Sequence, residues 1–330
     1  GRSPLEAASI GVEMHDDDVT FRANLVTLSD EENYADKTML DYSAGEITTE
    51  ESTELMKAVA DALDTECIKF YPGISYRHLC VWSGGSTNVD LTPPHDISDK
   101  PIKEHLPKGD GADKLLEMMK ESEKILKDHP VNKARIEKGL NPATSIWLWG
   151  EGTKPHVDNF EEKYGLKGAV ISAVDLIKGI AKCAGMNSID VPGATGNCDT
   201  NWEGKAQAAL DALLDGYDFV YIHMEAPDEM GHQGKPDKKK FAVETIDSKV
   251  VKFLKDELEK RGIDFRMLIM PDHPTPIKLK THVSDPVPYV IYDSTDTEHG
   301  SGLSYSEENG KSTGVYIEKG YTLMDKFLGR

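Results

Sequence analysis

The sequence predicts an α/β fold in which a mostly parallel sheet is covered by helices on both faces. From about residue 145 onward, short apolar segments alternate with longer segments whose apolar residues recur at helical spacing. Such alternation is typical of parallel strands, because each parallel pair needs a crossover connection, usually a helix. The expected strands span 146–149, 168–172, 219–223, 267–270 and 289–292, and the expected helices span 173–184, 204–215 and 241–260.

The first half of the chain has a different pattern, which indicates an α+β domain. Thr48-x-x-Glu51 is a capping box, and it predicts a helix that starts there and ends near Leu63. The other expected elements are strands at 19–27, 68–71 and 76–82 and helices at 112–127 and 131–138. Strands and helices are less regularly alternated here than in the second half.

The chain is strongly acidic. Its 330 residues include 38 basic and 58 acidic side chains, which give a formal net charge of −20. This charge argues against nucleic acid or an anionic membrane as a partner. The four cysteines are too few for a disulfide scaffold and predict reduced thiols in a cytoplasmic protein. The sequence contains no run of 18 apolar residues, and its length predicts two domains.

Two of the expected strands run directly into side chains of the kind that bind metals. The third expected strand is followed by Asp228 and His232, and the fourth by Asp272, His273 and then His282. Because ligands gather beyond the carboxyl ends of parallel strands, we expect these five side chains to converge. Asp228 and His232 are four residues apart, so on a helical turn they share one face.

This set predicts a divalent-metal centre. Imidazole with carboxylate suits zinc, manganese or iron, and hard oxygen ligands favour manganese or magnesium. Taken singly, each residue also has a simpler interpretation as a helix cap, a strand end or an ordinary loop residue. Five of them at two successive strand ends favour the metal. The glycines near 150–152 and 310–312 do not complete a nucleotide-binding motif.

With both ligand groups placed, the sequence resembles the cofactor-independent phosphoglycerate mutases, in their archaeal-type branch, which belong to the alkaline phosphatase superfamily. The Asp-x-x-Gly-His pattern at 228–232 points to the superfamily, together with Asp272-His273 and the later His282. Trp147-Leu-Trp149 and Pro93-Pro-His-Asp96 point to the branch. The other matching stretches are 1–7, 21–24, 41–45, 76–78, 129–135 and 174–178.

The resemblance implies two divalent ions. Asp228, His232 and His282 would hold one, and Asp272 and His273 would hold the other together with an Asp and a nucleophilic Ser. Manganese is expected, with zinc, magnesium or cobalt as alternatives. In the family the Asp and the Ser lie upstream of the stretch with which this chain begins. Either that leading segment is missing from this chain or the protein is catalytically inert, and we expect the first.

The implied architecture is a phosphatase-like domain at 1–17 and 146–330, with a substrate-binding domain inserted at 18–145 and the active site in the cleft between them. The implied reaction interconverts 3-phosphoglycerate and 2-phosphoglycerate, a step of glycolysis, through a phosphoserine intermediate. One alternative is a related phosphotransferase that acts on another small acceptor such as homoserine. The other is a metal-binding relative without turnover.

Residues for catalysis and for binding the small phosphorylated acid are also implied by the resemblance. Each has a simpler interpretation: Arg77 as a surface strand residue, His95 and Asp96 as part of a turn, Asn132 as a helix cap, and Lys178 as an exposed helix lysine. No oligomeric state is predicted. The expected catalytic residues are Lys178, His95 and Arg77, and the expected substrate-binding residues are His78, Asp96, Arg22, Asn132 and Arg135.

Overall fold

The chain folds into two units, each built on its own sheets. The computed structural model describes residues 2–296, 298 and 300–330. Unit 1 holds the chain up to Asn159 together with Asp175–Gly185, and unit 2 holds Phe160–Val174 together with Met186–Arg330. The units are defined by compactness alone, so the predicted division into a phosphatase-like domain and an insert stays a prediction.

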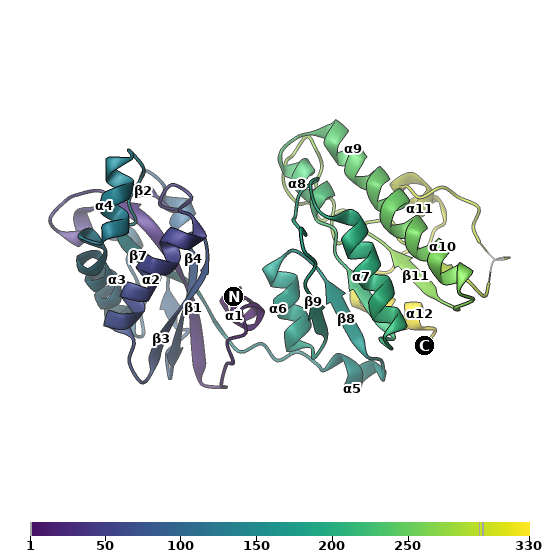
Figure 1. Cartoon of the computed structure of the whole chain (residues 1–330), viewed down its shortest axis with the longest axis horizontal. Helices are drawn as coiled ribbons and strands as arrows, with labels where there is room; N and C mark the ends of the chain where they lie inside the picture. The colour runs from purple at the N-terminus through teal and green to yellow at the C-terminus, as the bar shows by residue number, and fades with distance from the viewer. Residues whose placement is uncertain (1, 297, 299) are drawn as a thin grey trace. The chain divides into compact units, whose positions relative to one another are not determined.

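Unit 1 is built on an antiparallel sheet of five strands, in the order β2-β1-β4-β3 with β7 also paired to β1 (Figure 1). A short antiparallel pair, β5 and β6, lies outside it. The elements are α1 (Ser3–Ser9), β1 (Asp18–Leu28), β2 (Met39–Asp41), α2 (Thr49–Leu63), β3 (Ile68–Ile74), β4 (Arg77–Ser83), β5 (Val89–Asp90), β6 (Lys108–Gly109), α3 (Ala112–Lys127), α4 (Pro130–Glu137), β7 (Ser145–Thr153) and α6 (Asp175–Cys183), with 3-10 turns at Tyr34–Asp36, Pro94–Ile97 and Lys103–His105.

The two faces of this sheet are covered differently. Alternate residues of β1, such as Phe21 and Leu25, are fully buried in a core to which α2 and α3 contribute. On the other face, Leu79 and Val81 of β4 pack with Ala7 of α1, which lies on the opposite side of the sheet from α2 in Figure 1. The side chains of strands alternate between the faces, so one strand serves both layers.

The predicted start of α2 is confirmed. The Thr48 hydroxyl oxygen accepts a hydrogen bond from the Glu51 backbone N–H at 3.3 Å, and the hydroxyl donates to the Glu51 carboxylate at 2.9 Å. The helix ends at Leu63, as the sequence predicts. Capping by a side-chain oxygen satisfies one of the N–H groups that the first helical turn leaves unpaired.

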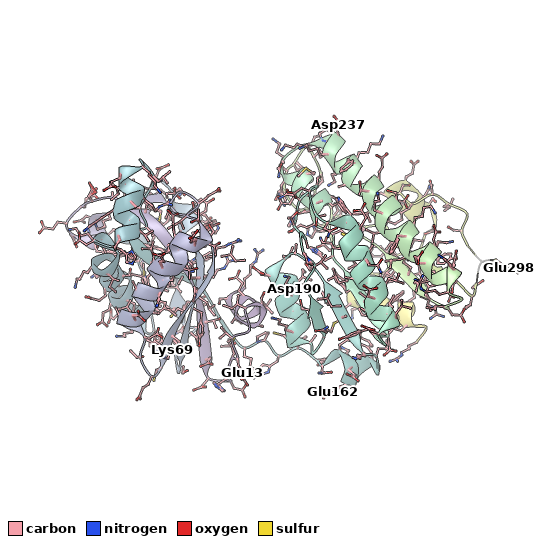
Figure 2. The ribbon with its side chains drawn as sticks, in the orientation of Figure 1. Glu13, Lys69, Glu162, Asp190, Asp237 and Glu298 are labelled. Atoms are coloured by element: carbon pink, nitrogen blue, oxygen red, sulfur yellow. The ribbon has the colours of Figure 1, made fainter. Side chains whose placement is uncertain are left out.

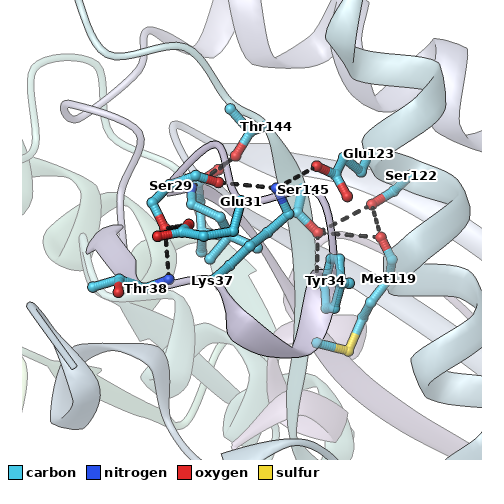
Figure 3. Close-up of polar contacts among 12 residues, drawn as sticks. Ser29, Glu31, Tyr34, Lys37, Thr38, Met119, Ser122, Glu123, Thr144 and Ser145 are labelled. Carbon is cyan, nitrogen blue, oxygen red and sulfur yellow. Dashed lines mark hydrogen bonds and ion pairs between the residues drawn. The ribbon is translucent and has the colours of Figure 1, made fainter. Parts of the chain in front are cut away.

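A buried polar network ties the segment before β2 to α3 and β7 (Figure 3). The Tyr34 hydroxyl lies 2.9 Å from the Ser145 hydroxyl, which in turn lies 3.4 Å from that of Ser122. The ammonium group of Lys37, which is almost fully buried, pairs with Glu123 at 2.9 Å. These polar groups are buried with partners, as the energetic cost of an unpaired polar group requires.

Unit 2 has a parallel sheet of three strands, in the order β10-β8-β9, and a separate antiparallel pair, β11 and β12. Its elements are α5 (Phe160–Tyr164), β8 (Gly168–Ile171), β9 (Asn187–Ile189), α7 (Trp202–Leu214), β10 (Phe219–Ile222), α8 (Ala226–His232), α9 (Pro236–Thr245), α10 (Lys252–Lys260), β11 (Arg266–Ile269), β12 (Val290–Asp293), α11 (Glu307–Ser312) and α12 (Leu323–Leu328), with a π-helical turn at Ile246–Val251 and a 3-10 turn at Gly320–Thr322.

The α/β class is confirmed, but the prediction of a mostly parallel sheet is wrong in two places. The strand expected at 146–149 belongs to the antiparallel sheet of unit 1, where β7 pairs with β1. The last two expected strands, β11 and β12, pair antiparallel with each other. The segment between them is rich in proline and forms no helix in the structure, so it cannot supply the helical crossover that usually joins parallel strands.

Helices pack on the strands of unit 2. Leu210 of α7 and Leu254 of α10 lie in one apolar cluster with Ile171 of β8, and Ile222 of β10 packs against it. On the alternate side of β10, Phe219 contacts Phe160 of α5 and Phe327 of α12, with ring centroids 5.0 Å and 6.3 Å away. β10 is therefore packed on both of its sides, by Ile222 at its end and by Phe219 at its start.

The acidic surface is spread over both units. Side chains such as Glu13 in unit 1 and Asp237 in unit 2 are exposed and point outward from the ribbon in Figure 2. Across the described residues, no helix combines the length and apolar character that a bilayer span requires. The cytoplasmic location stays a prediction.

Candidate metal centre and substrate residues

The short helix α8 presents two of the predicted ligands on one face. Asp228 and His232 are one helical turn apart, and His232 Nε2 lies 3.3 Å from Asp228 Oδ2. Pro227 stands in the first turn, where a missing N–H costs no hydrogen bond. The spacing of four residues therefore produces the shared face that the sequence predicts.

His282 joins this pair from a distant loop. Its Nε2 lies 3.2 Å from Asp228 Oδ1 and 3.0 Å from His232 Nε2. Lys280, two residues earlier, has a positive φ of 53°. Few residues other than glycine adopt this conformation without strain, and such strain is often found at functional sites.

The atoms of these three residues are spaced as the ligands of one ion would be. Ligand atoms about 2.1 Å from an ion lie about 3.0 Å apart at octahedral angles and about 3.4 Å apart at tetrahedral angles. The two Nε2 atoms are 3.0 Å apart, and each lies 3.2 or 3.3 Å from a different oxygen of Asp228, so each separation falls in this range.

The hydrogen bonding of His232 also fits a metal ligand. His232 Nδ1 lies 3.0 Å from the Lys280 carbonyl oxygen, which can only accept, so Nδ1 carries the proton. Nε2 then presents a lone pair toward Asp228 and His282. A backbone carbonyl that fixes the tautomer in this way is a common partner of metal-binding histidines.

The other two predicted ligands lie against the first three. His273 Nε2 is 3.2 Å from Asp272 Oδ2, and the His273 ring contacts the His282 ring with centroids 3.7 Å apart. The five residues Asp228, His232, Asp272, His273 and His282, called here the ligand cluster, therefore converge as expected. Binding of metal to them stays a prediction.

Sequence reasoning missed two further carboxylates. Glu225 and Glu229 each place an oxygen within 4.8 Å of Asp228 and of each other. Burial raises the pKa of Glu225, and the nearby Glu229 and Asp228 carboxylates raise it further. Both glutamates lie close to Asp228 in the sequence after β10, so their position could have identified them as candidates.

His223, which directly follows β10, lies beside the cluster. Burial lowers its pKa, although the Asp272 carboxylate acts in the opposite direction. Its Nδ1 lies 3.1 Å from the Ser172 hydroxyl at the end of β8. This contact joins two parallel strand ends close to the ligand cluster.

In unit 1, one expected catalytic residue, His95, and two expected substrate-binding residues, Arg22 and Asp96, lie along a row of aromatic rings. The guanidinium of Arg22 lies 4.7 Å from the centre of the Trp149 ring, and the His95 ring lies 5.3 Å from Trp149. His95 also contacts Tyr42, with centroids 6.2 Å apart. Asp96 lies beside His95, with Oδ1 3.6 Å from His95 Nε2.

The same row continues to Arg77. Tyr42 and Tyr76 meet edge to face at 5.8 Å, and the Arg77 guanidinium lies 5.6 Å from the Tyr76 ring centre. Burial raises the pKa of Tyr76, while the positive charges of Arg77 and Arg22 lower it. The structure thus brings Arg22, Arg77 and His95 to one face, and Tyr42, Tyr76 and Trp149 form what we call the aromatic row.

The sequence analysis did not predict the aromatic row. Trp149 lies in the Trp-Leu-Trp stretch and Tyr42 in the Asp-Tyr-Ser-Ala-Gly stretch, so the signal was present without a role attached. Arg22 has a second partner, because its Nε donates to both Glu6 carboxylate oxygens at 3.1 and 2.9 Å.

Three other expected substrate residues are buried in unit 1 and have structural contacts. His78 is 3 % exposed, and its Nδ1 accepts the Gly73 backbone N–H at 2.9 Å. The Asn132 amide donates to two backbone carbonyls, at 2.9 and 2.7 Å. Arg135 pairs with Glu51 at 2.6 Å and also donates to two carbonyls. Their expected roles in substrate binding stay untested.

Lys178 lies on α6 of unit 1 and is half-buried. The ligand cluster belongs to unit 2. The role expected for Lys178 on the transferred phosphoryl group therefore stays a prediction.

Comparison with known proteins gives consistent results. Residues 1–132 match the family model described as 2,3-bisphosphoglycerate-independent phosphoglycerate mutase. A probable enzyme of that name from Geobacter sulfurreducens is 50 % identical over the whole chain, which covers 82 % of the relative. The Methanosarcina barkeri enzyme is 47 % identical over 98 % of the chain and 80 % of its own length.

Among solved structures, the cofactor-independent phosphoglycerate mutase of Thermoplasma acidophilum superposes with a TM-score of 0.65 at 26 % identity. That match covers 100 % of this chain and 81 % of the other.

Proposed function

This chain belongs to the family of 2,3-bisphosphoglycerate-independent phosphoglycerate mutases, and we propose that its ligand cluster is the metal centre of that activity. The enzyme is an isomerase that interconverts 3-phosphoglycerate and 2-phosphoglycerate, a step of glycolysis. The names of the relatives do not favour a homoserine phosphotransferase or a relative without turnover.

One observation carries the proposed metal centre. Asp228, His232 and His282 converge from a helix and a distant loop, and the Lys280 carbonyl fixes the tautomer that leaves His232 Nε2 free to bind. Asp272 and His273 would hold a second ion. The mixture of imidazole and carboxylate oxygen, with further carboxylates nearby, favours manganese.

When bound, a pair of divalent ions stabilises negative charge on phosphoryl oxygens and on the entering and leaving oxygens. Other residues of this chain hold the side chains of the ligand cluster in place. Glu225 and Glu229 add negative charge beside Asp228, which strengthens the attraction for cations.

We propose that the residues along the aromatic row bind the substrate's carboxylate and phosphate. The guanidinium of the exposed Arg77 lies 5.6 Å from the Tyr76 ring centre, and an aromatic neighbour of this kind favours a guanidinium held in place and open to solvent. A guanidinium can donate two parallel hydrogen bonds to a carboxylate or a phosphate. His95, beside Asp96, is the proposed proton-transfer group.

The phosphoserine route stays a prediction here. The serine and the aspartate that the resemblance implies precede residue 1 in the family, so their geometry does not enter the proposal. The assignment of unit 1 to substrate binding and of unit 2 to metal binding rests on which residues each unit contains.

The decisive experiment measures manganese binding and turnover in the same preparations. Purified protein is stripped with a chelator, titrated with Mn²⁺ under electron paramagnetic resonance, and incubated with 3-phosphoglycerate without added bisphosphoglycerate. We expect Asp228→Asn to lose both Mn²⁺ binding and formation of 2-phosphoglycerate. Asp237→Asn, which changes an exposed aspartate of α9, is the matched control and should keep both. Wild-type turnover that survives complete removal of metal would rule the proposal out.

A further inference from the structure

Thr275 connects the two halves of the ligand cluster. It lies in the loop after β11 and is 3 % exposed. Its hydroxyl donates a hydrogen bond to Asp228 Oδ1 on α8 and lies 3.4 Å from His273 Nδ1. One side chain therefore touches a ligand from each of the two chain segments that form the cluster.

The backbone of Thr275 is also fixed against the helices. Its carbonyl oxygen accepts a hydrogen bond from the Lys239 ammonium group of α9 at 2.7 Å. The close approach of α8 depends on Gly231, because a Cβ there would lie 2.5 Å from the same carbonyl oxygen and 2.9 Å from the Thr275 methyl group. The loop is thus held by packing and by a charged donor, and the hydroxyl is left to contact Asp228.

We infer that Thr275 is a positioning residue, whose hydroxyl sets the orientation of the Asp228 carboxylate within the metal centre. The inference rests on the proposed function. With Oδ1 held by Thr275, the carboxylate plane is fixed, and Oδ2 is kept toward His232 Nε2. Hydrogen-bond partners that orient a metal ligand typically change metal affinity by about 10–100-fold when removed.

Thr275→Val separates this role from packing, because valine has nearly the same shape and lacks only the hydroxyl. Thr275→Ser keeps the hydroxyl and loses the methyl group, so it should restore binding. The matched control is Thr295→Val. Thr295 also donates from its hydroxyl to an aspartate, at 2.7 Å to Asp293 Oδ1, but Asp293 is not a member of the ligand cluster.

The experiment measures the dissociation constant of Mn²⁺ by electron paramagnetic resonance, independently of turnover. We expect Thr275→Val to bind Mn²⁺ about 10–100-fold more weakly than wild type. Thr275→Ser and Thr295→Val should bind close to the wild-type value. Equal affinity of wild type and Thr275→Val would overturn the role of Thr275, while the proposed metal centre would stand.

If the proposed function is wrong, the result is different, because wild type itself binds no Mn²⁺. That outcome would refute both the metal centre and the role of Thr275. Far-ultraviolet circular dichroism reports whether each variant is folded. If Thr275→Val does not fold, Thr275→Ala takes its place with the same expected loss. Wild-type affinity in the alanine variant would equally overturn the inference.

Discussion

Acid should destabilise unit 1 through His78. This imidazole is buried in the antiparallel sheet with its Nδ1 accepting the Gly73 N–H, and its Nε2 finds no hydrogen-bond partner among the described residues. Burial lowers the pKa of His78 from its usual 6.5 to about 3, while the nearby Ser75 backbone acts in the opposite direction. The folded protein therefore keeps His78 neutral through the mildly acidic range.

The direction in which the free energy of unfolding changes with pH follows from proton binding. Below pH 6.5 the unfolded chain takes up a proton at His78 that the folded chain does not, so the free energy of unfolding falls as pH falls toward 3. Above pH 6.5 the imidazole is neutral in both states and the effect disappears. Between pH 7 and pH 5 this one group should remove about 2 kcal/mol of stability.

The assay compares wild type with His78→Asn. An asparagine carbonyl can still accept the Gly73 N–H, but it does not titrate. Both proteins carry Trp202→Phe, so that the three remaining tryptophans, all in unit 1, report its unfolding in urea. Other titrating groups cancel in the comparison, and wild type should lose about 2 kcal/mol more than the variant between pH 7 and pH 5.

Parallel pH dependence in the two proteins would refute the reasoning, because it would mean that His78 takes up its proton in the folded state. The result also bears on function. A histidine that stays neutral at pH 7 and has its Nδ1 engaged cannot supply positive charge to a phosphate.

Two further predictions concern packing in unit 1. Arg135→Met should lower the free energy of unfolding by about 3 kcal/mol, since it leaves Glu51 and two carbonyl oxygens without their donor. The control is Lys114→Met, which removes an exposed ion pair and should change the free energy of unfolding little. Equal losses of stability for the two variants in urea unfolding would contradict the prediction for Arg135. Gly179→Ala should lower the free energy of unfolding by about 1–3 kcal/mol, because the added Cβ would lie 2.0 Å from a backbone oxygen of α1. The control is Gly320→Ala, which adds a methyl group in open space. Thermal unfolding followed by circular dichroism measures the glycine pair, and a fully stable Gly179→Ala would show that α1 and α6 do not pack this closely.

Local patterns were reliable where the structure is set by neighbours in sequence. The capping box of Thr48 and Glu51 marks the start of α2, and the spacing of four places Asp228 and His232 on one face of α8. These outcomes depend only on helix geometry and on the first unpaired N–H groups. The five members of the ligand cluster come together as expected, although β11, which precedes Asp272 and His273, is not part of the parallel sheet.

The supporting residues were found only in the structure. Thr275 reaches Asp228 because the path of the loop after β11 returns to α8, and that path is set by Gly231 and Lys239. The aromatic row likewise depends on how separate segments pack. No periodicity in the sequence encodes such contacts between distant residues.

The sequence by itself determined the residue types of the ligand cluster, their positions after strands and the longer helices of the chain. The tertiary structure decided which sheet β7 joins and which groups Arg135 contacts. An apolar strand has the same local pattern whether its partner is parallel or antiparallel, and an arginine is the same residue whether it meets substrate or Glu51. Strand pairing and burial are settled by the whole fold, because the free energy of each contact depends on which distant groups are available to make it.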